Sequence, residues 1–220
     1  MIAVPLHIEF SEPVLATALE GDPNSATSYP FIPGSQIRGA LATRYWKSHQ
    51  VTDLAADPKA RRLFFEGSTR FLNAYPLDSA GDRMLPVPLS WRMEKGSEPP
   101  TLIYDWSIAK EEGDLEVPKP VGSPFCRLKY GAVELGEPLR RVAVHTQRDR
   151  QMGRATEDSG AVFRYEALAP GQAFEAAILF EDQATADLLA PHIEGMIFLG
   201  GSRSAGYGAA SILPGEPSTS

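Results

Sequence analysis

Cysteine, positive charge and long apolar runs are all scarce in this chain. Cys126 is the only cysteine, which excludes an internal disulfide and any multi-cysteine zinc site and suits a reducing compartment. We expect it to be a small packed apolar residue. No run reaches the ~18 apolar residues of a membrane span, and residues 1–5 lack the features of a secretory signal. The sequence therefore predicts a cytoplasmic protein with no membrane, metal or cofactor.

Positive charge is scarce overall, because 21 Lys and Arg residues stand against 28 Asp and Glu residues, which gives the 220-residue chain a formal net charge of −7. Non-specific nucleic-acid binding needs clustered Lys and Arg, so this average argues against a broad nucleic-acid surface. Acids gather at residues 111–116 and 181–194, whereas in residues 140–154 Asp149 is the single acid. The basic residues of that segment are Arg140, Arg141, His145, Arg148, Arg150 and Arg154. A local basic stripe on an acidic protein indicates one defined contact.

Four glycines gather near the end of the chain, in residues 199–208 with the sequence LGGSRSAGYG. Glycine tolerates positive φ and close approach, so this segment can either cradle a phosphate with its amide groups or form a flexible turn. It follows an apolar run of helical character and precedes a strand expected over residues 209–213. Taken alone, the segment leaves both interpretations open.

Periodicity predicts the first elements. Residues 2–10 alternate between apolar and polar, which predicts a half-buried strand, and Pro5 indicates a sheet edge or a strand irregularity. Residues 11–34 are expected to form a loop. Ser35 can then cap a helix over residues 35–47. This helix would have Arg38 on one face and, on the other, Ile37, Leu41 and Tyr45.

The remaining chain is expected to contain further strands and helices, interrupted by one long irregular segment. Residues 76–138 hold nine of the 19 prolines and show poor periodicity, so we expect an insertion with short strands of its own. A helix is also expected over residues 55–65, and strands are expected over 68–75, 139–146, 162–168 and 172–180, with a turn at 169–171. A last helix, capped by Asp182 and bent at Pro191, is expected to carry the apolar residues Ala186, Leu189, Ile193 and Ile197.

Without the insertion, the predicted order is strand, helix, strand, strand, helix, strand. This order predicts an α+β fold of the ferredoxin-like βαββαβ type, the plan of the RNA recognition motif. We expect one domain over residues 1–213, an insertion at about 77–138, and a tail or linker over 214–220. The aromatic signature that stacks on RNA in recognition motifs is absent, so any RNA contact must use loops.

Three stretches carry a family resemblance. They are FIPGSQIRGALA at residues 31–42, HTQRDRQMGRA at residues 145–155 running into FRYEAL, and the terminal glycine segment. Together they resemble the RAMP superfamily of CRISPR-associated proteins, over most of residues 1–213. With FLNAYP at residues 71–76, the sequence is most similar to the Csx ten family, a subunit of type III-D effector complexes. Members of that family are usually longer, so this chain is either a fragment or a compact relative.

The resemblance implies a non-catalytic scaffold in antiviral defence. Such a subunit holds guide RNA within a ribonucleoprotein, meets target RNA indirectly, and contacts other RAMP subunits and a large polymerase-like subunit. The long insertion can act as a thumb between bases. We expect the helix start, the arginine loop and the glycine segment to converge on one groove. The residues expected to contact RNA are Gly34, Ser35, Arg38, His145, Arg148, Arg150, Arg154, Gly201, Ser202, Arg203, Ser204 and Gly206.

Alternative functions place chemistry at two of these segments. Asp22 lies roughly where relatives that cut target RNA keep a loop aspartate, although its sequence is also ordinary for a turn. His145 beside the basic run could act as a general acid or base in a repeat-processing endoribonuclease, but no partner histidine is evident in the sequence. A third possibility is an interaction module that docks a neighbouring subunit through acidic residues 181–194.

Overall fold

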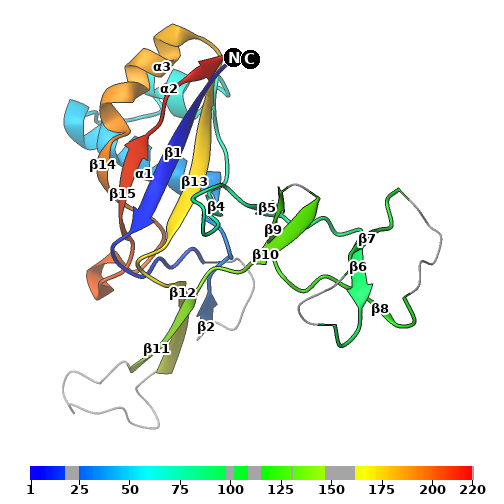
Figure 1. The fold of residues 1–220 in the computed structure, drawn as a ribbon. Coiled ribbons are helices and arrows are strands. Elements are labelled where there is room, and N and C mark those ends of the chain that lie inside the picture. Colours follow the sequence, from blue (N-terminus) through cyan, green and yellow to red (C-terminus); the bar gives the residue numbers. More distant parts are fainter. Residues whose placement is uncertain (18–24, 98–101, 109–114, 130, 147–161, 220) are drawn as a thin grey trace. The chain divides into compact units, whose positions relative to one another are not determined.

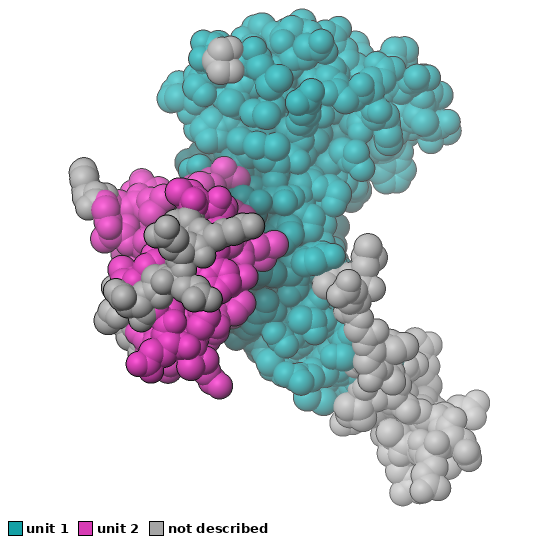
Figure 2. Space-filling view, turned by 90° about the vertical axis from the view of Figure 1, so that its right-hand side faces the viewer, with its two compact units in different colours: residues 1–77, 138–220 teal, residues 78–137 magenta. Residues whose placement is uncertain are grey.

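The protein's structure is a computed structural model that describes residues 1–17, 25–97, 102–108, 115–129, 131–146 and 162–219. These residues fall into two compact units. Unit 1 consists of Met1–Leu77 and Pro138–Ser220, and unit 2 consists of Asp78–Glu137 (Figure 2).

Unit 1 is built on an antiparallel sheet with β1 (Ile2–Phe10) as a central strand. On one side β1 pairs with β13 (Ala173–Phe180), and on the other with β15 (Ala209–Pro214). The sheet continues through β14 (Gly195–Phe198) beyond β15 and through β3 (Thr69–Phe71) beyond β13. The resulting order is β14-β15-β1-β13-β3 (Figure 1).

Two short strands complete this sheet. β4 (Tyr75–Pro76) pairs with β13, and β16 (Ser218–Thr219) pairs with the start of β1, which brings the two termini together (Figure 1). The strand predicted over residues 68–75 is therefore divided into β3 and β4. Between them lies Asn73, whose side chain has a role at the candidate site.

The alternation predicted for β1 is confirmed, and its proline marks an irregularity. Pro5 does not lie at a sheet edge, because β1 is paired on both sides. Pairing with β15 covers Leu6–Phe10, whereas pairing with β16 covers only Ile2 and Ala3. Proline has no N–H to donate, and it falls at the break between these two partners. The buried side chains of β1 are Val4, Leu6, Ile8 and Phe10.

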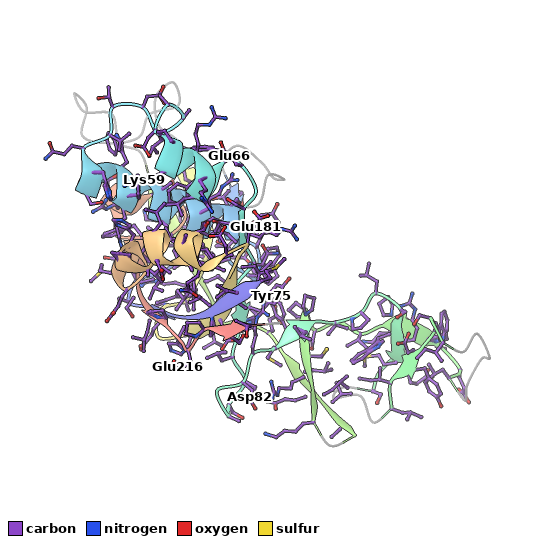
Figure 3. All side chains as sticks on the ribbon, turned by 90° about the horizontal axis from the view of Figure 1, so that it is seen from above. Lys59, Glu66, Tyr75, Asp82, Glu181 and Glu216 are labelled. Carbon is purple, nitrogen blue, oxygen red and sulfur yellow. The ribbon has the colours of Figure 1, made fainter. Side chains whose placement is uncertain are left out.

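The helices of unit 1 cover one face of the central sheet (Figures 1 and 3). They are α1 (Gly34–His49), α2 (Pro58–Phe64) and α3 (Gln183–Leu189). As predicted, Ile37, Leu41 and Tyr45 of α1 are buried in the core against the sheet. Burial of an apolar side chain of this size contributes about 1.5–3 kcal/mol. No helix within the described ranges is long and apolar enough to cross a membrane.

The start of α2 differs from the prediction over residues 55–65. The helix begins at Pro58, because the Asp57 side chain caps it by accepting a hydrogen bond from the Ala60 N–H at 2.6 Å. Proline fits the first helical position, where its missing N–H has no partner to lose.

The helix predicted from Asp182 to Ile197 was wrong in its second half. Asp182 does cap α3, accepting from the Thr185 N–H at 2.8 Å, but α3 ends at Leu189. A short 3₁₀ helix, η1 (Ala190–His192), follows, with Pro191 inside it. Gly195 then has φ of 99°, which no α-helix accommodates, and Ile197 pairs with Ala210 in the sheet. The glycine segment therefore joins two strands, β14 and β15.

A second, three-stranded sheet also belongs to unit 1. β11 (Arg140–Thr146) and β12 (Val162–Leu168) form the antiparallel pair that the sequence predicts. The third strand, β2 (Ser25–Thr27), runs parallel to β12 within the region expected to be loop. Its three residues are too few to carry a periodic signal. An isolated bridge from Val14 to Leu168 links residues 11–17 to this sheet.

Unit 2 contains two small sheets of short strands. One has the order β10 (Ala132–Gly136), β9 (Phe125–Lys129), β5 (Leu85–Pro86), and the other the order β7 (Tyr104–Asp105), β6 (Trp91–Glu94), β8 (Pro118–Pro120). As predicted, Cys126 is a buried packing residue, and burial raises the pKa of its thiol.

Candidate nucleic-acid interface

The start of α1 is held by backbone packing and a side-chain amide. Pro33 occupies the cap position without a side-chain hydrogen bond, so Ser35 is not the predicted N-cap but lies in the first turn. The Gly34 N–H donates to Asn73 Oδ1 at 2.9 Å. A Cβ on Gly34 would collide with the Phe71 carbonyl. The Gly34 N–H is therefore engaged within the fold, and the glycine allows close packing of α1 against residues 71–72.

Ser35 and Arg38 are exposed in the first turns of α1. Neither side chain is used by the core, so both are accessible to a ligand. Arg38 is exposed but lies beside the buried stripe rather than on the opposite face that was predicted, because residues seven apart, such as Arg38 and Tyr45, point in nearly the same direction from a helix.

The glycine loop (residues 199–208) is anchored at both ends. The Leu199 N–H donates to the Gly208 carbonyl at 2.9 Å. Residues 11–17 hold the loop from outside, because the Gly201 N–H donates to the Leu15 carbonyl at 3.1 Å and the Gly208 N–H donates to the Pro13 carbonyl at 2.9 Å. The loop is thus held in a defined conformation by backbone hydrogen bonds.

The tip of the loop is a short 3₁₀ helix, η2 (Arg203–Ala205). Left-handed residues flank it, with φ of 59° at Ser202 and 79° at Gly206. Gly201, Arg203, Ser204 and Gly206 are exposed, and Ser202 is half-buried. The predicted loop residues therefore lie at the surface of unit 1.

A groove joins α1 to the glycine loop. It consists of two adjoining cavities of about 420 and 470 Å³ that share Ala40, Thr43 and Phe198, and we call it the α1 groove. Along α1 it runs from Gln36 to Ser48, which is about 18 Å at 1.5 Å per residue. Its other lining residues are Leu15, Thr17, Gly39, Arg44, Lys47, Met196, Ile197, Gly200, Gly201 and Arg203.

The α1 groove is positively charged, because Arg44, Lys47 and Arg203 line it and no acidic residue lines either cavity within the described chain. Arg44 is engaged, because its guanidinium donates to the carbonyls of His192, Ile193 and Glu194 at 2.7–3.0 Å and also to that of Met196. Burial lowers the pKa of this guanidinium. Lys47, from α1, and Arg203, from the glycine loop, are exposed cations that both line the groove.

Gln36 adds an unsatisfied polar atom to the α1 groove. Its Oε1 is buried without a hydrogen-bond partner among the described residues. Such an atom is uncommon in a folded protein, because an unpaired buried acceptor costs free energy. Gln36 therefore offers a hydrogen-bond acceptor to a bound polar group.

His145 contacts the glycine loop from β11. Its Nε2 lies 3.0 Å from the Tyr207 hydroxyl, and its ring packs on Tyr165 with centroids 4.8 Å apart. This contact brings the end of β11 to the loop. Arg148, Arg150 and Arg154, which follow β11, and Asp22 lie outside the described residues.

Two histidines that the sequence separates lie together. The rings of His49 and His192 have centroids 5.0 Å apart, and the Nδ1 atoms lie 3.0 and 3.5 Å from the Ser48 hydroxyl. Neither histidine is the partner that His145 would need for acid–base catalysis. Among the described residues, no cluster of three His, Cys, Asp or Glu side chains could hold a metal ion.

Sequence reasoning missed the groove residues Gln36, Thr43, Lys47 and Phe198. Three of them lie on one flank of α1, at a spacing that also fits an ordinary solvated face. Phe198 was missed because it directly follows the helix predicted to end at Ile197. Met196, Ile197 and Phe198 are all apolar, so the alternation of their burial in β14 has no counterpart in the sequence pattern.

Known proteins share this fold. A chain from a structure described as type III-B Cmr-beta bound to cognate target RNA superposes with a TM-score of 0.55 at 14% identity, covering 96% of each chain. A chain from a type IV-B CRISPR complex superposes with a TM-score of 0.51 at 13% identity, covering 97% of this chain and 90% of that one. A comparison with curated protein sequences found no match.

A family match extends over most of the sequence. Residues 16–211 match the RAMP superfamily, so the segment includes α1, the three-stranded sheet of β11, β12 and β2, and the glycine loop, whereas β1 of the central sheet precedes it. The match agrees with the resemblance that the motifs carry. It is made at the level of the superfamily, and the assignment to the Csx ten family stays a prediction. This protein belongs to the RAMP superfamily.

Proposed function

We propose that this RAMP protein is a non-catalytic subunit of a type III CRISPR effector ribonucleoprotein that binds the backbone of guide RNA in the α1 groove. The observation that carries the proposal is the groove itself, which joins α1 to the glycine loop and has cations but no acids on its described walls. Clustered positive charge is the basis of phosphate binding.

The groove dimensions suit an extended single strand. Its length of about 18 Å along α1 accommodates about three nucleotides, since a backbone repeat spans about 6 Å when extended. Lys47 from α1 and Arg203 from the glycine loop can meet successive nucleotides. The exposed residues Gly201, Ser204 and Gly206 leave room for close approach to the loop backbone.

The fold of unit 1 supports the ferredoxin-like assignment. The sheet order β15-β1-β13-β3, with α1 between β1 and β3 and α3 between β13 and β15, matches a βαββαβ plan. We propose that residues 1–213 are one RAMP domain, that residues from about 77 to 138 are an insertion in it, and that 214–220 are a tail or linker. A structure of similar fold is described as bound to cognate target RNA, which supports a contact with target RNA. The cytoplasmic location and the partners, which are other RAMP subunits and a polymerase-like subunit, are proposed from the family resemblance.

Binding is favoured over catalysis. His145 is hydrogen-bonded to Tyr207 and packed on Tyr165, and no second histidine contacts it among the described residues. A histidine held in this way suits a structural link between β11 and the glycine loop. Cleavage of target RNA by Asp22 is a separate prediction that Asp22→Ala tests, with the loss of one cleavage position as its expected result.

A groove-filling variant tests the proposal. Thr43 is exposed in the middle of the α1 groove, so Thr43→Trp should fill it and weaken binding of a single-stranded guide RNA at least tenfold. Fluorescence anisotropy of labelled RNA measures the affinity. Lys59→Trp, at an exposed position of α2 outside the groove, is the matched control and should bind like the wild type. Equal affinity of the wild type and Thr43→Trp would overturn the proposal.

A further inference from the structure

A cation–π contact lies at the point where β14 enters the glycine loop. The Arg203 Cζ atom lies 3.6 Å from the centroid of the Phe198 ring. At this distance the planar guanidinium is in van der Waals contact with the ring. Arg203 is exposed, and no ion pair joins it to an acid in the described ranges. Its partner is therefore an aromatic face rather than a carboxylate.

The loop backbone fixes this pair in place. The Ala205 N–H donates to the Ser202 carbonyl at 2.9 Å, and the Gly206 N–H donates to the Arg203 carbonyl at 3.2 Å. Residues in the left-handed region on both sides of η2 complete the turn. The backbone of Arg203 is thus held in a hydrogen-bonded turn and its guanidinium rests on the Phe198 ring, so the long side chain loses less freedom when it binds a ligand.

Both residues of the pair line the α1 groove, and Phe198 lines each of its two cavities. A ligand in the groove therefore passes directly beside them. A guanidinium covered by a ring on one face still presents a second planar face. Single-stranded nucleic acids are commonly held by bases that stack on aromatic rings and on arginine planes.

We infer that Arg203, supported by Phe198, is a stacking platform for one unpaired nucleobase of the RNA bound in the α1 groove. The inference rests on the proposed function and adds a base contact to a site otherwise made of backbone contacts. It assigns Arg203 a role beyond that of a phosphate-binding cation. Stacking on a π face tolerates every base, so the contact holds the strand without reading its sequence.

Two substitutions separate stacking from charge. Arg203→Lys keeps the positive charge and removes the planar surface, and Phe198→Leu keeps an apolar side chain and removes the ring. Each should weaken binding of single-stranded RNA about tenfold. The slope of log affinity against log salt should stay at the wild-type value for both, because no phosphate contact is lost.

A base-modified RNA gives a direct readout. A 2-aminopurine at the stacked position should lose fluorescence on binding the wild type, and much less on binding either variant. A scan with abasic sites should find one position whose removal weakens wild-type binding about tenfold and leaves Phe198→Leu binding unchanged. Lys59→Arg, on α2, is the control for the substitution chemistry and should behave as the wild type.

The outcomes distinguish this inference from the function beneath it. If the wild type binds no single-stranded RNA, the proposed function and the inference both fail. If the wild type binds and Arg203→Lys has the same affinity and the same 2-aminopurine signal, the inference alone fails. If Phe198→Leu loses its folded circular dichroism spectrum, the test of stacking rests on Arg203→Lys, because Arg203 is exposed and its substitution should not disturb the fold.

Discussion

Arg44 links α1 to the segment between η1 and β14 through hydrogen bonds from a single side chain. It extends from α1 to four backbone carbonyls in residues 192–196, at the chain reversal between η1 and β14. Three of these carbonyls lie at or directly after the end of η1, where a helix leaves its last carbonyls without intrahelical donors. A guanidinium suits this role because it offers several N–H donors in one plane.

We predict that Arg44→Ala lowers the free energy of unfolding by about 1.5–3 kcal/mol, because the carbonyls lose charged hydrogen bonds. Urea denaturation measures the change. The matched control is Arg38→Ala at an exposed position of the same helix, which should change stability by less than about 0.5 kcal/mol. Equal effects of the two substitutions would show that the Arg44 hydrogen bonds contribute nothing to stability.

The buried His192, which lies beside the exposed His49, makes stability depend on pH. Burial lowers the pKa of His192 below its ordinary value of 6.5, and the nearby His49 and Arg44 lower it further. The unfolded chain therefore takes up this proton more readily than the folded chain does. The stabilisation from a neutral His192 should be complete at pH values above the pKa that this histidine has in the unfolded chain. It should be lost as the pH falls below that pKa towards the lower pKa of the folded protein.

Thermal unfolding at about pH 7.5 and about pH 5.5 measures this dependence. We expect a lower midpoint at the acidic pH, and His192→Gln should make the difference smaller. His7→Gln, at an exposed position of β1, should leave it unchanged. An unchanged difference in His192→Gln would assign the acid sensitivity to other groups.

At the scale of elements, the two glycines of α1 have opposite roles. Gly34 is buried against the backbone of residues 71–72, whereas Gly39 is exposed, and a Cβ added to it would meet no atom within 4 Å. One glycine makes room for the strand beside the helix. The other only adds conformational freedom to the unfolded chain.

Alanine substitutions separate these roles. Gly34→Ala should destabilise the protein by about 1–3 kcal/mol, since the added methyl group forces α1 away from β3. Gly39→Ala should stabilise it by about 0.5–1 kcal/mol, because alanine favours the helix. Chemical denaturation of both variants measures the difference. A neutral Gly34→Ala would contradict the close packing at this helix start.

At the scale of the whole molecule, unit 1 holds both ends of the segment that forms unit 2. The Leu77 N–H donates to the Ala173 carbonyl at 3.1 Å. The Leu139 N–H donates to Gln172 Oε1 at 2.6 Å, and the Leu139 carbonyl accepts from the Ala169 N–H at 2.9 Å. The residues on both sides of unit 2 are therefore hydrogen-bonded, within unit 1, to the turn between β12 and β13 and to the first residue of β13.

Replacing residues 78–137 by a short Gly-Ser linker should leave unit 1 folded. We expect a single cooperative thermal transition, because the central sheet and its helices bury their core within unit 1. Differential scanning calorimetry and circular dichroism measure this outcome. A variant without a cooperative transition would show that unit 1 needs residues 78–137 to fold.

The sequence by itself determined the local elements with strong patterns. Strict alternation placed β1, helical spacing placed the buried face of α1, and Asp182 placed the start of α3. These signals are local, because a period of two or 3.6 residues and a capping side chain act within one element. The motifs around Gly34, His145 and the glycine loop also indicated the RAMP superfamily.

Tertiary structure decided what depends on contacts between distant segments. Residues 195–198 form a strand because β15 offers a pairing edge, which the apolar run alone does not reveal. Asn73 holds the start of α1, and Phe198 with Lys47 completes a groove that no single stretch contains. Pairing and packing over long sequence separations carry no local period, so the composition of the candidate site came only with the fold.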